Sequence, residues 1–285
     1  MNINNITINA INIDEIILNA LREDIGTGDI TTITTIPANK TAHGKFIAKE
    51  DGVICGLEVC ERVFKLLDDT IDFKTFLKDG DKVADGEVFA EISGNARNLL
   101  TGERTALNIL QRMSGIATMT AEFAAQIAGT KAKITDTRKT TPGLRVLEKY
   151  AVRIGGGTNH RFNLADGILI KDNHITASGG ITQAVKSARA NAPHTLKIEV
   201  ECENMHDVSE AIEAGADIIM LDNMSIDEMR QAVDFIAGRA LTEASGNMDE
   251  KDLRAVADAG VDIISIGALT RNAKSLDTSL KFTLA

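Results

Sequence analysis

Two stretches in the C-terminal half of the chain repeat one pattern, "EAIEAGADIIMLDN" (residues 210–223) and "AVADAGVDIISIGA" (residues 255–268). Both contain Ala-Gly-x-Asp-Ile-Ile, which reads as the end of a helix, a glycine that stops the helix, and an apolar strand. A helix followed by a buried strand is half of a βα unit, and repeats of this unit build a parallel sheet covered by helices. The two stretches therefore predict an α/β fold.

Short apolar runs of strand type recur along the second part of the chain, at residues 132–135, 167–170, 195–201, 217–221, 240–244 and 261–266. Helical patterns such as "SIDEMRQAVDFIAG" (residues 225–238) separate these runs. No Gly-x-Gly-x-x-Gly sequence follows a first strand, so the pattern gives no support for a dinucleotide-binding sheet. Polar residues follow nearly every run, as they do around the active sites of barrels. We therefore expect an incomplete (β/α) barrel.

The first 110 residues show another pattern. The stretches "HGKFIAKEDGVICG" (residues 43–56) and "DFKTFLKDGDKVADGEVFAEISG" (residues 72–94) contain Asp-Gly turns between short strand patterns, which is typical of antiparallel hairpins. We expect residues 1–110 to form an N-terminal α+β sandwich domain and residues 111–285 to form the (β/α) barrel catalytic domain. A long helix over about residues 101–128 should connect them, and the C-terminal tail should return to the first domain.

The composition is that of a globular protein, with 285 residues, 44% hydrophobic and 25% charged. No run of 18 apolar residues occurs, so no membrane-spanning helix is expected. The N-terminal segment lacks the basic and apolar regions of a signal peptide. Three cysteines are too few and too unevenly spaced for a disulfide framework, which indicates reduced thiols and a cytoplasmic protein.

The net charge is −10, and the chain has one Tyr and no Trp, which argues against nucleic acid and anionic membranes as partners. Residues 136–174 differ from the rest because they carry seven Lys and Arg against four Asp and Glu. Within them, "DTRKTTPGLR" (residues 136–145) sets Arg138 and Lys139 directly after an apolar run. Positive residues at a strand end in an acidic protein indicate a site for a small, highly charged anion.

The residues at the ends of the predicted strands have complementary chemistry. Arginine and lysine bind carboxylates and phosphates, and the candidates for this task are Arg138, Lys139, Arg161 and Lys171. Carboxylates such as Glu201 and Asp222 suit magnesium or ribose hydroxyls. The small residues Ser245–Asn247 and Ser265–Ala268 allow backbone N–H groups to approach a phosphate. The substrates indicated are a phosphosugar with several negative charges and a compact carboxylate.

Several of these residues also have a purely structural interpretation. A lysine at a strand end, such as Lys171, is often the ion-pair partner of a neighbouring carboxylate, and the structural interpretation of Glu199, on the inner face of the barrel, is a pair with a lysine in the layer below. His174 and His194 are expected at the surface or at a helix cap. The glycines of residues 155–157 are consistent with a flexible turn. The functional interpretation rests on all six strand ends being polar or glycine-rich together.

The order and content of eight motifs resemble those of the quinolinate phosphoribosyltransferase family. These motifs are "EDIGTGDITT" (23–32), "ERTALNILQRMSGIAT" (103–118), "DTRKTTPGLR" (136–145), "GGGTNHRFNLADGILIKDNHI" (155–175), "IEVECEN" (198–204), "LDNM" (221–224), "EASGN" (243–247) and "ISIGALT" (264–270). The resemblance covers nearly the whole chain, and its two longest motifs are highly specific. It does not extend to the first dozen residues.

The resemblance implies phosphoribosyl transfer from phosphoribosyl pyrophosphate to quinolinate with loss of CO2, with Mg²⁺ as the cofactor, in NAD biosynthesis. It implies that the quinolinate pocket is formed by Thr137, Arg138, Lys139, His160, Arg161 and Lys171, with Arg104 contributed by the neighbouring subunit of a homodimer or of a larger assembly such as a hexamer. Catalytic roles would fall to Lys139, Glu201 and Asp222. The last two would face the ribose and magnesium, directly or through water. The phosphates would contact Ser245, Gly246, Asn247, Ser265 and Gly267.

Three alternatives to this function remain at the level of sequence. A Schiff-base aldolase would use Lys171 as its nucleophile. Relatives associated with molybdenum transport share the family's fold, and a non-catalytic binding protein would hold the phosphosugar without releasing CO2. In the transferase, the carbanion left by CO2 loss must be protonated, and Lys139 and His160 are both candidates for the donor.

Overall fold

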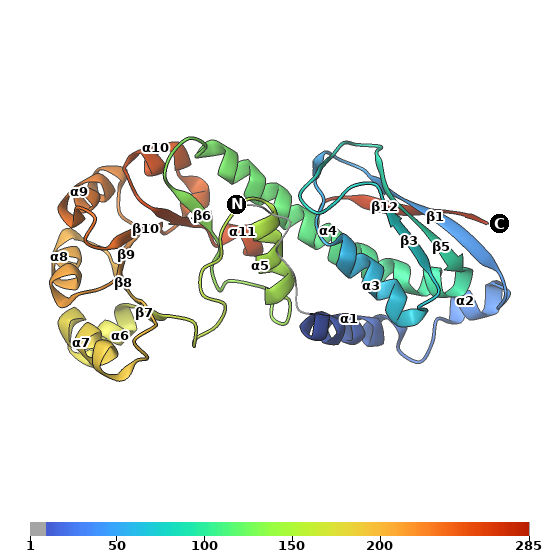
Figure 1. Ribbon diagram of the computed structural model, residues 1–285, viewed down its shortest axis with the longest axis horizontal. Helices are drawn as coiled ribbons and strands as arrows, with labels where there is room; N and C mark the ends of the chain where they lie inside the picture. The colour runs from blue at the N-terminus through green and yellow to red at the C-terminus, as the bar shows by residue number, and fades with distance from the viewer. Residues whose placement is uncertain (1–9, 285) are drawn as a thin grey trace. The chain divides into compact units, whose positions relative to one another are not determined.

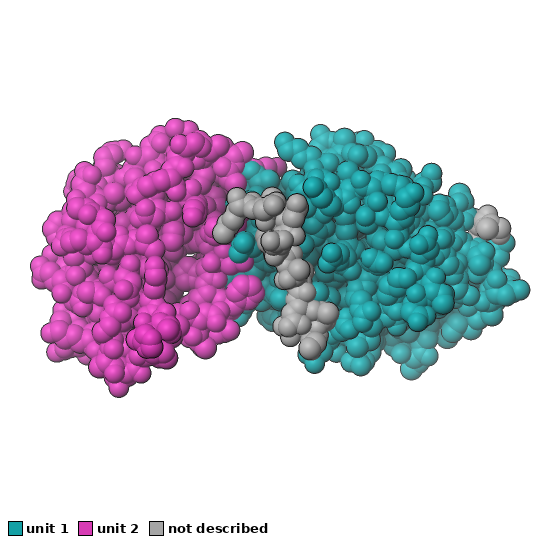
Figure 2. Space-filling view, viewed as in Figure 1, with its two compact units in different colours: residues 1–121, 140–156, 272–285 teal, residues 122–139, 157–271 magenta. Residues whose placement is uncertain are grey.

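The computed structural model describes residues 10–284, so the expectation of no signal peptide falls partly on residues outside the described part of the chain. By their contacts the residues form two compact units that are discontinuous in sequence (Figure 2). Unit 1 holds residues 1–121, 140–156 and 272–285, and unit 2 holds residues 122–139 and 157–271. The domain boundary expected near residue 110 stays a prediction.

Unit 1 is built on a four-stranded antiparallel sheet in the order β12-β1-β5-β3 (Figure 1). Its strands are β1 (Thr41–Ala48), β3 (Asp72–Thr75), β5 (Val88–Asn95) and β12 (Thr278–Leu284), and a second small sheet pairs β2 (Gly52–Val53) with β4 (Lys82–Val83). Its helices are α1 (Ala10–Ile25), α2 (Ile30–Thr35), α3 (Leu57–Leu67), α5 (Arg145–Ile154) and most of α4 (Ala96–Gln126). Strand β12 shows that the end of the chain pairs with a strand formed near its beginning.

The core of unit 1 contains a cluster of four aromatic rings. The Phe46 ring centroid lies 5.5 Å from that of Phe73, 5.9 Å from that of Phe89 and 6.3 Å from that of Phe64. These residues come from β1, β3, β5 and α3, so the cluster joins the sheet to the helix that covers it. Burial of aromatic side chains at these distances is a large part of the stability of such a core.

Unit 2 is a six-stranded parallel sheet in the order β6-β11-β10-β9-β8-β7, with helices outside it (Figure 1). The strands are β6 (Lys133–Thr135), β7 (Ile168–Ile170), β8 (Ile198–Cys202), β9 (Ile218–Asp222), β10 (Leu241–Ser245) and β11 (Ile263–Ser265). The helices are α6 (Asp172–Ser178), α7 (Ile181–Asn191), α8 (Met205–Ala214), α9 (Ile226–Ile236), α10 (Leu253–Asp258) and α11 (Ala268–Arg271), with a 3₁₀ turn at Met248–Glu250.

The sheet curls back on itself without closing. Strands β6 and β7 form its two edges, and the only bridge recorded near this gap joins Thr135 to Thr158, which precedes β7. Each of the six predicted apolar runs overlaps one of these strands, and β8, β9 and β10 extend one residue beyond the predicted runs. The predicted fold class, an incomplete (β/α) barrel preceded by an α+β sandwich, is confirmed.

Side-chain caps begin three of the helices of unit 2. Asn204 caps α8, Ser225 forms a capping box with Glu228 at the start of α9, and Asp252 caps α10. These caps satisfy N–H groups that would otherwise lack partners in the first turn of a helix. Short capped connections keep the strand ends in fixed positions, and those ends carry the polar residues considered below. Among the residues that the structure describes, no helix is both long and apolar enough to cross a membrane.

Candidate active site

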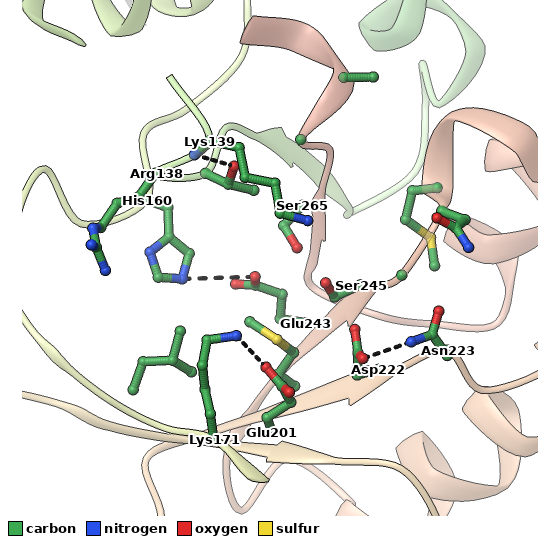
Figure 3. A pocket seen from close by; sticks show the side chains of 18 of the residues that line it. Arg138, Lys139, His160, Lys171, Glu201, Asp222, Asn223, Glu243, Ser245 and Ser265 are labelled. Carbon is green, nitrogen blue, oxygen red and sulfur yellow. Dashed lines mark hydrogen bonds and ion pairs between the residues drawn. The ribbon is translucent and has the colours of Figure 1, made fainter. Parts of the chain in front are cut away.

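The carboxyl ends of the six strands of unit 2 surround a cavity of about 530 Å³ (Figure 3). Its lining comes from the ends of β6 to β11 and from the loops that follow or precede them, including the segment before β7. Parallel strands bring their carboxyl ends to one edge of a sheet, which explains why residues more than 100 positions apart meet here. All the residues that line this cavity belong to unit 2.

One side of the cavity is rich in cations. Arg138, Lys139 and Arg161 lie on it, and Arg161 also donates a hydrogen bond of 2.8 Å to the carbonyl of Gly167. Burial lowers the pKa of Arg161 from its ordinary value, and the nearby charge of Arg138 lowers it further, while Glu199 opposes the change. Two arginines close enough to disfavour each other's charge are a site that an anion would stabilise.

Lys171 has the ion-pair partner that its position at a strand end suggested. Its Nζ lies 2.5 Å from Oε2 of Glu201, which is at the end of the neighbouring strand β8. Both residues still line the cavity, and the lysine side chain is 44% exposed. The pair therefore combines a cation and a carboxylate at the cavity wall, and either group is accessible to a ligand.

Asp222 is the second carboxylate at the cavity wall. It ends β9, and its Oδ2 accepts a 2.7 Å hydrogen bond from the side chain of Asn223. In Figure 3, Asp222 lies beside Asn223 and Ser245, away from the cationic side. Neighbouring Lys251 donates to the carbonyl of Met224, and burial lowers the pKa of this lysine while Asp222 opposes the change.

The loop after β10 brings the backbone close to Asn223. Gly246 has a φ of +89°, and a Cβ built on it would lie 2.2 Å from Oδ1 of Asn223. Asn223 and Asn247 themselves have φ of +56° and +50°. Non-glycine residues rarely adopt this conformation, which costs about 1 kcal/mol or more at each position. Asn223, Gly246 and Asn247 thus bring three positive φ angles together at one edge of the cavity, which indicates a backbone conformation suited to a ligand.

Gly267, in the loop after β11, makes room for Lys139. A Cβ on Gly267 would lie 2.9 Å from Cδ of Lys139, so the lysine stem passes directly over the glycine. The carbonyl of Lys139 also accepts a 2.9 Å hydrogen bond from the hydroxyl of Thr270. These contacts tie the end of β6 to the loop after β11 and hold the lysine at the cavity.

The segment before β7 is anchored by a fully buried carboxylate. Asp136 accepts hydrogen bonds from the side chain of Asn159 at 2.6 Å and from the backbone N–H of His160 at 2.9 Å. It was not assigned a role from the sequence, although it opens the motif at residue 136. Its contacts fix the position of His160, which lines the cavity.

His160 lies over two buried glutamates. Its Nε2 is 3.0 Å from Oε2 of Glu199 and 3.8 Å from Oε1 of Glu243, and a dashed line in Figure 3 joins His160 to Glu243. Its Nδ1 accepts a 2.8 Å hydrogen bond from the backbone N–H of Arg161. A ring nitrogen that accepts carries no proton, so the neutral ring has its proton on Nε2, directed at Glu199. Glu199 therefore pairs with His160 and not with a lysine in the layer below.

Glu243 is the more unusual of the two acids. Burial raises its pKa above the ordinary 4.5, the charge of Glu199 raises it further, and His160 and the hydroxyl of Ser265 oppose the rise. Oε1 of Glu199 and Oε1 of Glu243 accept no hydrogen bond from any residue in the described part of the chain. Two carboxylates this close cannot both be ionised at low cost, so we infer that Glu243 holds a proton at neutral pH.

Thirteen of the fourteen residues predicted to form the site line this one cavity. They are Thr137, Arg138, Lys139, His160, Arg161, Lys171, Glu201, Asp222, Ser245, Gly246, Asn247, Ser265 and Gly267. The exception is Arg104, which is exposed on the part of α4 that belongs to unit 1. The roles of these residues in binding and catalysis stay predictions.

Sequence reasoning missed several residues of the lining, among them Glu243, Asp249 and Arg271. A signal for Glu243 was present, because it lies two positions before Ser245 on a strand and therefore shares its face. Asp249 and Arg271 lie in short turns beyond the strand ends, where neither periodicity nor spacing indicates a direction.

Comparisons with known proteins agree along the whole chain. Residues 29–114 match the family pattern for "Quinolinate phosphoribosyl transferase, N-terminal domain" and residues 116–281 match the one for the C-terminal domain. A probable nicotinate-nucleotide pyrophosphorylase [carboxylating] of Bacillus subtilis is 49% identical, over 92% of this chain and 91% of that protein. The crystal structure of NadC from Streptococcus pyogenes has a TM-score of 0.93 at 46% identity, covering 98% of this chain and 99% of that one.

A plant relative shows the same likeness at a greater distance. The mitochondrial quinolinate phosphoribosyltransferase [decarboxylating] 2 of Nicotiana glauca is 42% identical, over 94% of this chain and 81% of that protein.

Replacing Glu243 by Gln should make the protein relatively more stable as pH rises. The folded state keeps the Glu243 proton more tightly than the unfolded chain, so wild-type stability falls between the ordinary pKa of 4.5 and the raised folded value. The E243Q variant has no carboxyl group at this position, so its stability does not fall in this way. Its advantage in unfolding free energy should therefore grow by up to about 1.4 kcal/mol per pH unit over that interval and then level off.

Urea unfolding of both proteins from about pH 5 to 9 measures this difference. The same substitution at exposed Glu213, on α8, is the matched control. A difference between wild type and E243Q that stays constant across the whole range would contradict a proton held by Glu243.

Proposed function

The chain belongs to the quinolinate phosphoribosyltransferase family, and from that premise we propose which residues carry out its reaction. It is a decarboxylating phosphoribosyltransferase that converts quinolinate and phosphoribosyl pyrophosphate into nicotinate mononucleotide, pyrophosphate and CO2 in NAD biosynthesis. The observation that supports the assignment of residues is the cavity itself, in which cations lie on one side and carboxylates with glycine-rich loops on the other.

Quinolinate occupies the cationic side in this proposal. Arg138 and Arg161 bind its two carboxylates, with Lys139, Lys171 and Thr137 beside them. Burial, and secondly the charge of Arg138, lower the pKa of Arg161, and a dianion bound here would stabilise both positive charges. Fixing both carboxylates aims the ring nitrogen in one direction, and positioning of this kind contributes up to about 7–11 kcal/mol in well-oriented reactions.

The phosphate groups occupy the edge formed by the loops after β10 and β11. Gly246 and Asn247 hold the backbone in left-handed conformations there, while Ser245, Ser265 and Gly267 supply small side chains that allow N–H groups to approach. Backbone N–H groups in such turns bind phosphate oxygens without carrying a charge of their own. The late strands of a barrel are a common place for phosphate binding.

Glu201 and Asp222 face the sugar. Displacement of pyrophosphate from the anomeric carbon leaves a sugar that resembles a cation, and nearby carboxylates stabilise that developing charge. Lys171 keeps Glu201 in place through their ion pair. After the ring nitrogen has attacked, its positive charge stabilises the electron pair left when the adjacent carboxylate departs as CO2, so no base is required for that step.

The same two carboxylates fit Mg²⁺ as a cofactor. They lie at the ends of neighbouring strands, and neither belongs to a group of three or more metal-ligating side chains among the described residues. Magnesium is typically held by one or two carboxylates together with substrate phosphates, directly or through water, and this donor set meets that requirement. When bound, the ion would neutralise charge on the departing pyrophosphate.

We also propose that the enzyme works as a homodimer, or as a larger assembly such as a hexamer built from dimers. Arg104 is exposed on α4 and does not line the cavity of its own chain. A role at the quinolinate carboxylates therefore requires that a second subunit contribute it. A cytoplasmic location is part of the proposal, supported by the three buried free thiols Cys55, Cys60 and Cys202, and cell fractionation tests it.

The activity itself is tested with quinolinate labelled in its 2-carboxylate. With phosphoribosyl pyrophosphate and magnesium, we expect labelled CO2, pyrophosphate and nicotinate mononucleotide in equal amounts. Binding of phosphoribosyl pyrophosphate without CO2 would indicate a binding protein. A borohydride-trapped adduct at Lys171 would indicate an aldolase.

Replacing Arg138 by Gln should lower kcat/KM for quinolinate by about 10²–10³-fold, because the change leaves one carboxylate of a bound dianion without its partner. The fold should be retained, since Arg138 is at the cavity surface. Steady-state kinetics with quinolinate as the varied substrate measure the effect. Arg230→Gln is the matched control, because this exposed arginine pairs with Asp227 on a helix outside the cavity. Equal kinetics for wild type and R138Q would refute the assignment.

Mixed assemblies test the shared site. Arg104→Gln and Arg138→Gln should each be nearly inactive as homodimers. In a mixed dimer, the intact cavity of the R104Q subunit receives Arg104 from its partner, so one of the two cavities works and the mixed dimer should have about half of the wild-type activity. Co-expression with two different tags, followed by assay of the doubly tagged protein, measures it. No recovery would mean that Arg104 does not act across an interface.

A further inference from the structure

We propose that Glu243 is the acid that supplies the proton to the pyridine ring carbon after CO2 has left. The inference rests on the proposed function, because it concerns the last step of that reaction. It assigns a catalytic role to a residue that the sequence motifs did not single out.

The first observation is the position of the carboxyl group. Glu243 comes from the middle of β10, is 2% exposed, and lines the cavity beside His160. Its Oε1 accepts no hydrogen bond from any residue in the described part of the chain. It is therefore a buried acid whose accessible surroundings are the cavity that holds the reacting ring.

The second observation is the number of protons available to the pair of acids. One ring nitrogen of His160 and one carboxylate oxygen from each of Glu199 and Glu243 lie within 4.8 Å of one another. Because the Nδ1 of His160 accepts the N–H of Arg161, the imidazole carries its one proton on Nε2. Glu199 is the nearer of the two acids to Nε2, so this N–H donates to Glu199. Glu243 then faces a carboxylate without a donor for its Oε1, which is the arrangement in which an acid keeps its own proton.

The groups around Glu243 agree with a protonated acid. Glu199 from β8 and Asp136 after β6 add negative charge, and burial adds to their effect. His160 and the Ser265 hydroxyl on β11 act in the opposite direction. The partner on the neighbouring strand β9 is Met220, which carries no charge. A second ionised carboxylate here would also repel the dianion that the cations above it bind.

His160 is less suited to the same task. To become a donor toward the cavity it would have to turn Nε2 away from Glu199 or break the hydrogen bond at Nδ1. Its backbone is held by buried Asp136, which restricts such a movement. We assign it a positioning role, in which its Nε2 holds the Glu199 carboxylate at 3.0 Å.

The step balances as follows. The bond between the ring carbon and the carboxylate breaks, CO2 leaves, and the electron pair remains on the carbon next to the positively charged nitrogen. The Glu243 O–H bond then breaks as the new C–H bond forms, which gives nicotinate mononucleotide and leaves Glu243 ionised. A proton from water restores the acid when the product leaves and the cavity opens to solvent.

Single-turnover measurements of pyrophosphate and CO2 separate this step from the earlier ones. In Glu243→Gln, pyrophosphate should be released within a few-fold of the wild-type rate, whereas CO2 release should slow by about 10²–10⁴-fold, the usual contribution of a general acid. Without a donor the carbanion recaptures CO2, so the ribosylated quinolinate should accumulate. Equal slowing of both products in E243Q, or no slowing of CO2, would overturn the proposal.

Two further measurements distinguish the loss of a proton donor from a general disruption of the structure. In the wild type, raising the pH should slow CO2 release relative to pyrophosphate release as Glu243 loses its proton, and E243Q should lose this pH dependence. Glu199→Gln removes a negative charge that favours the protonated form of Glu243. In this variant the rate of CO2 release should therefore begin to decline at a lower pH than in the wild type. If Lys139→Gln alone slows CO2 selectively, the donor is Lys139 and our assignment is wrong. Wild type that releases no labelled CO2 at any pH would instead reject the proposed function.

Discussion

The parallel pairing of six short strands is the constraint from which the site follows. Because β6 to β11 run in one direction, their carboxyl ends meet at one edge, and every polar residue placed after a strand is delivered to the same cavity. The strands themselves are three to five residues long, so the first polar position lies close to the apolar layer beneath it. This closeness puts charged groups beside buried ones, and it accounts for much of the unusual electrostatics.

Those electrostatics divide the cavity into layers. Above lie Arg138 and Arg161, where burial and the charge of Arg138 lower the pKa of Arg161, and below lie Glu199 and Glu243, where burial and the charge of Glu199 raise the pKa of Glu243. Each arrangement costs stability in the free protein. A dianionic ligand relieves the first, and one retained proton relieves the second. Groups kept in such unfavourable states are characteristic of sites that bind or react, and His160 contacts both acids through Nε2.

The backbone of the phosphate side carries a related cost. Asn223 and Asn247 adopt left-handed conformations, and Gly246 lies against Asn223 so closely that no side chain fits. A chain selected only for stability would place glycine at all three positions or avoid the conformation. Asparagine adopts this conformation more readily than most residues with a side chain, and here the N–H of Asn223 donates a 3.1 Å hydrogen bond to the carbonyl of Ser245, which joins the loop after β9 to the end of β10.

The sequence by itself determined the architecture and thirteen of the residues that line the cavity. The repeat of helix, glycine and strand has a period that only a parallel α/β fold satisfies, and a residue directly after a strand has only one edge of the sheet to occupy. Arg138, Lys171, Glu201 and Asp222 were found for that reason. Arg104 lies outside this rule, because it is on a helix of unit 1 and no strand determines where it points.

Only the tertiary structure decided which charges face each other. The structural interpretation of Glu199 from the sequence paired it with a lysine, yet its partner is His160, which comes from a loop 39 positions away. The sequence contained Glu243, but its burial and its distance to Glu199 depend on how three separate strands and a loop pack. Protonation is set by such distances and by the exclusion of water, and neither is a property of residue order along the chain.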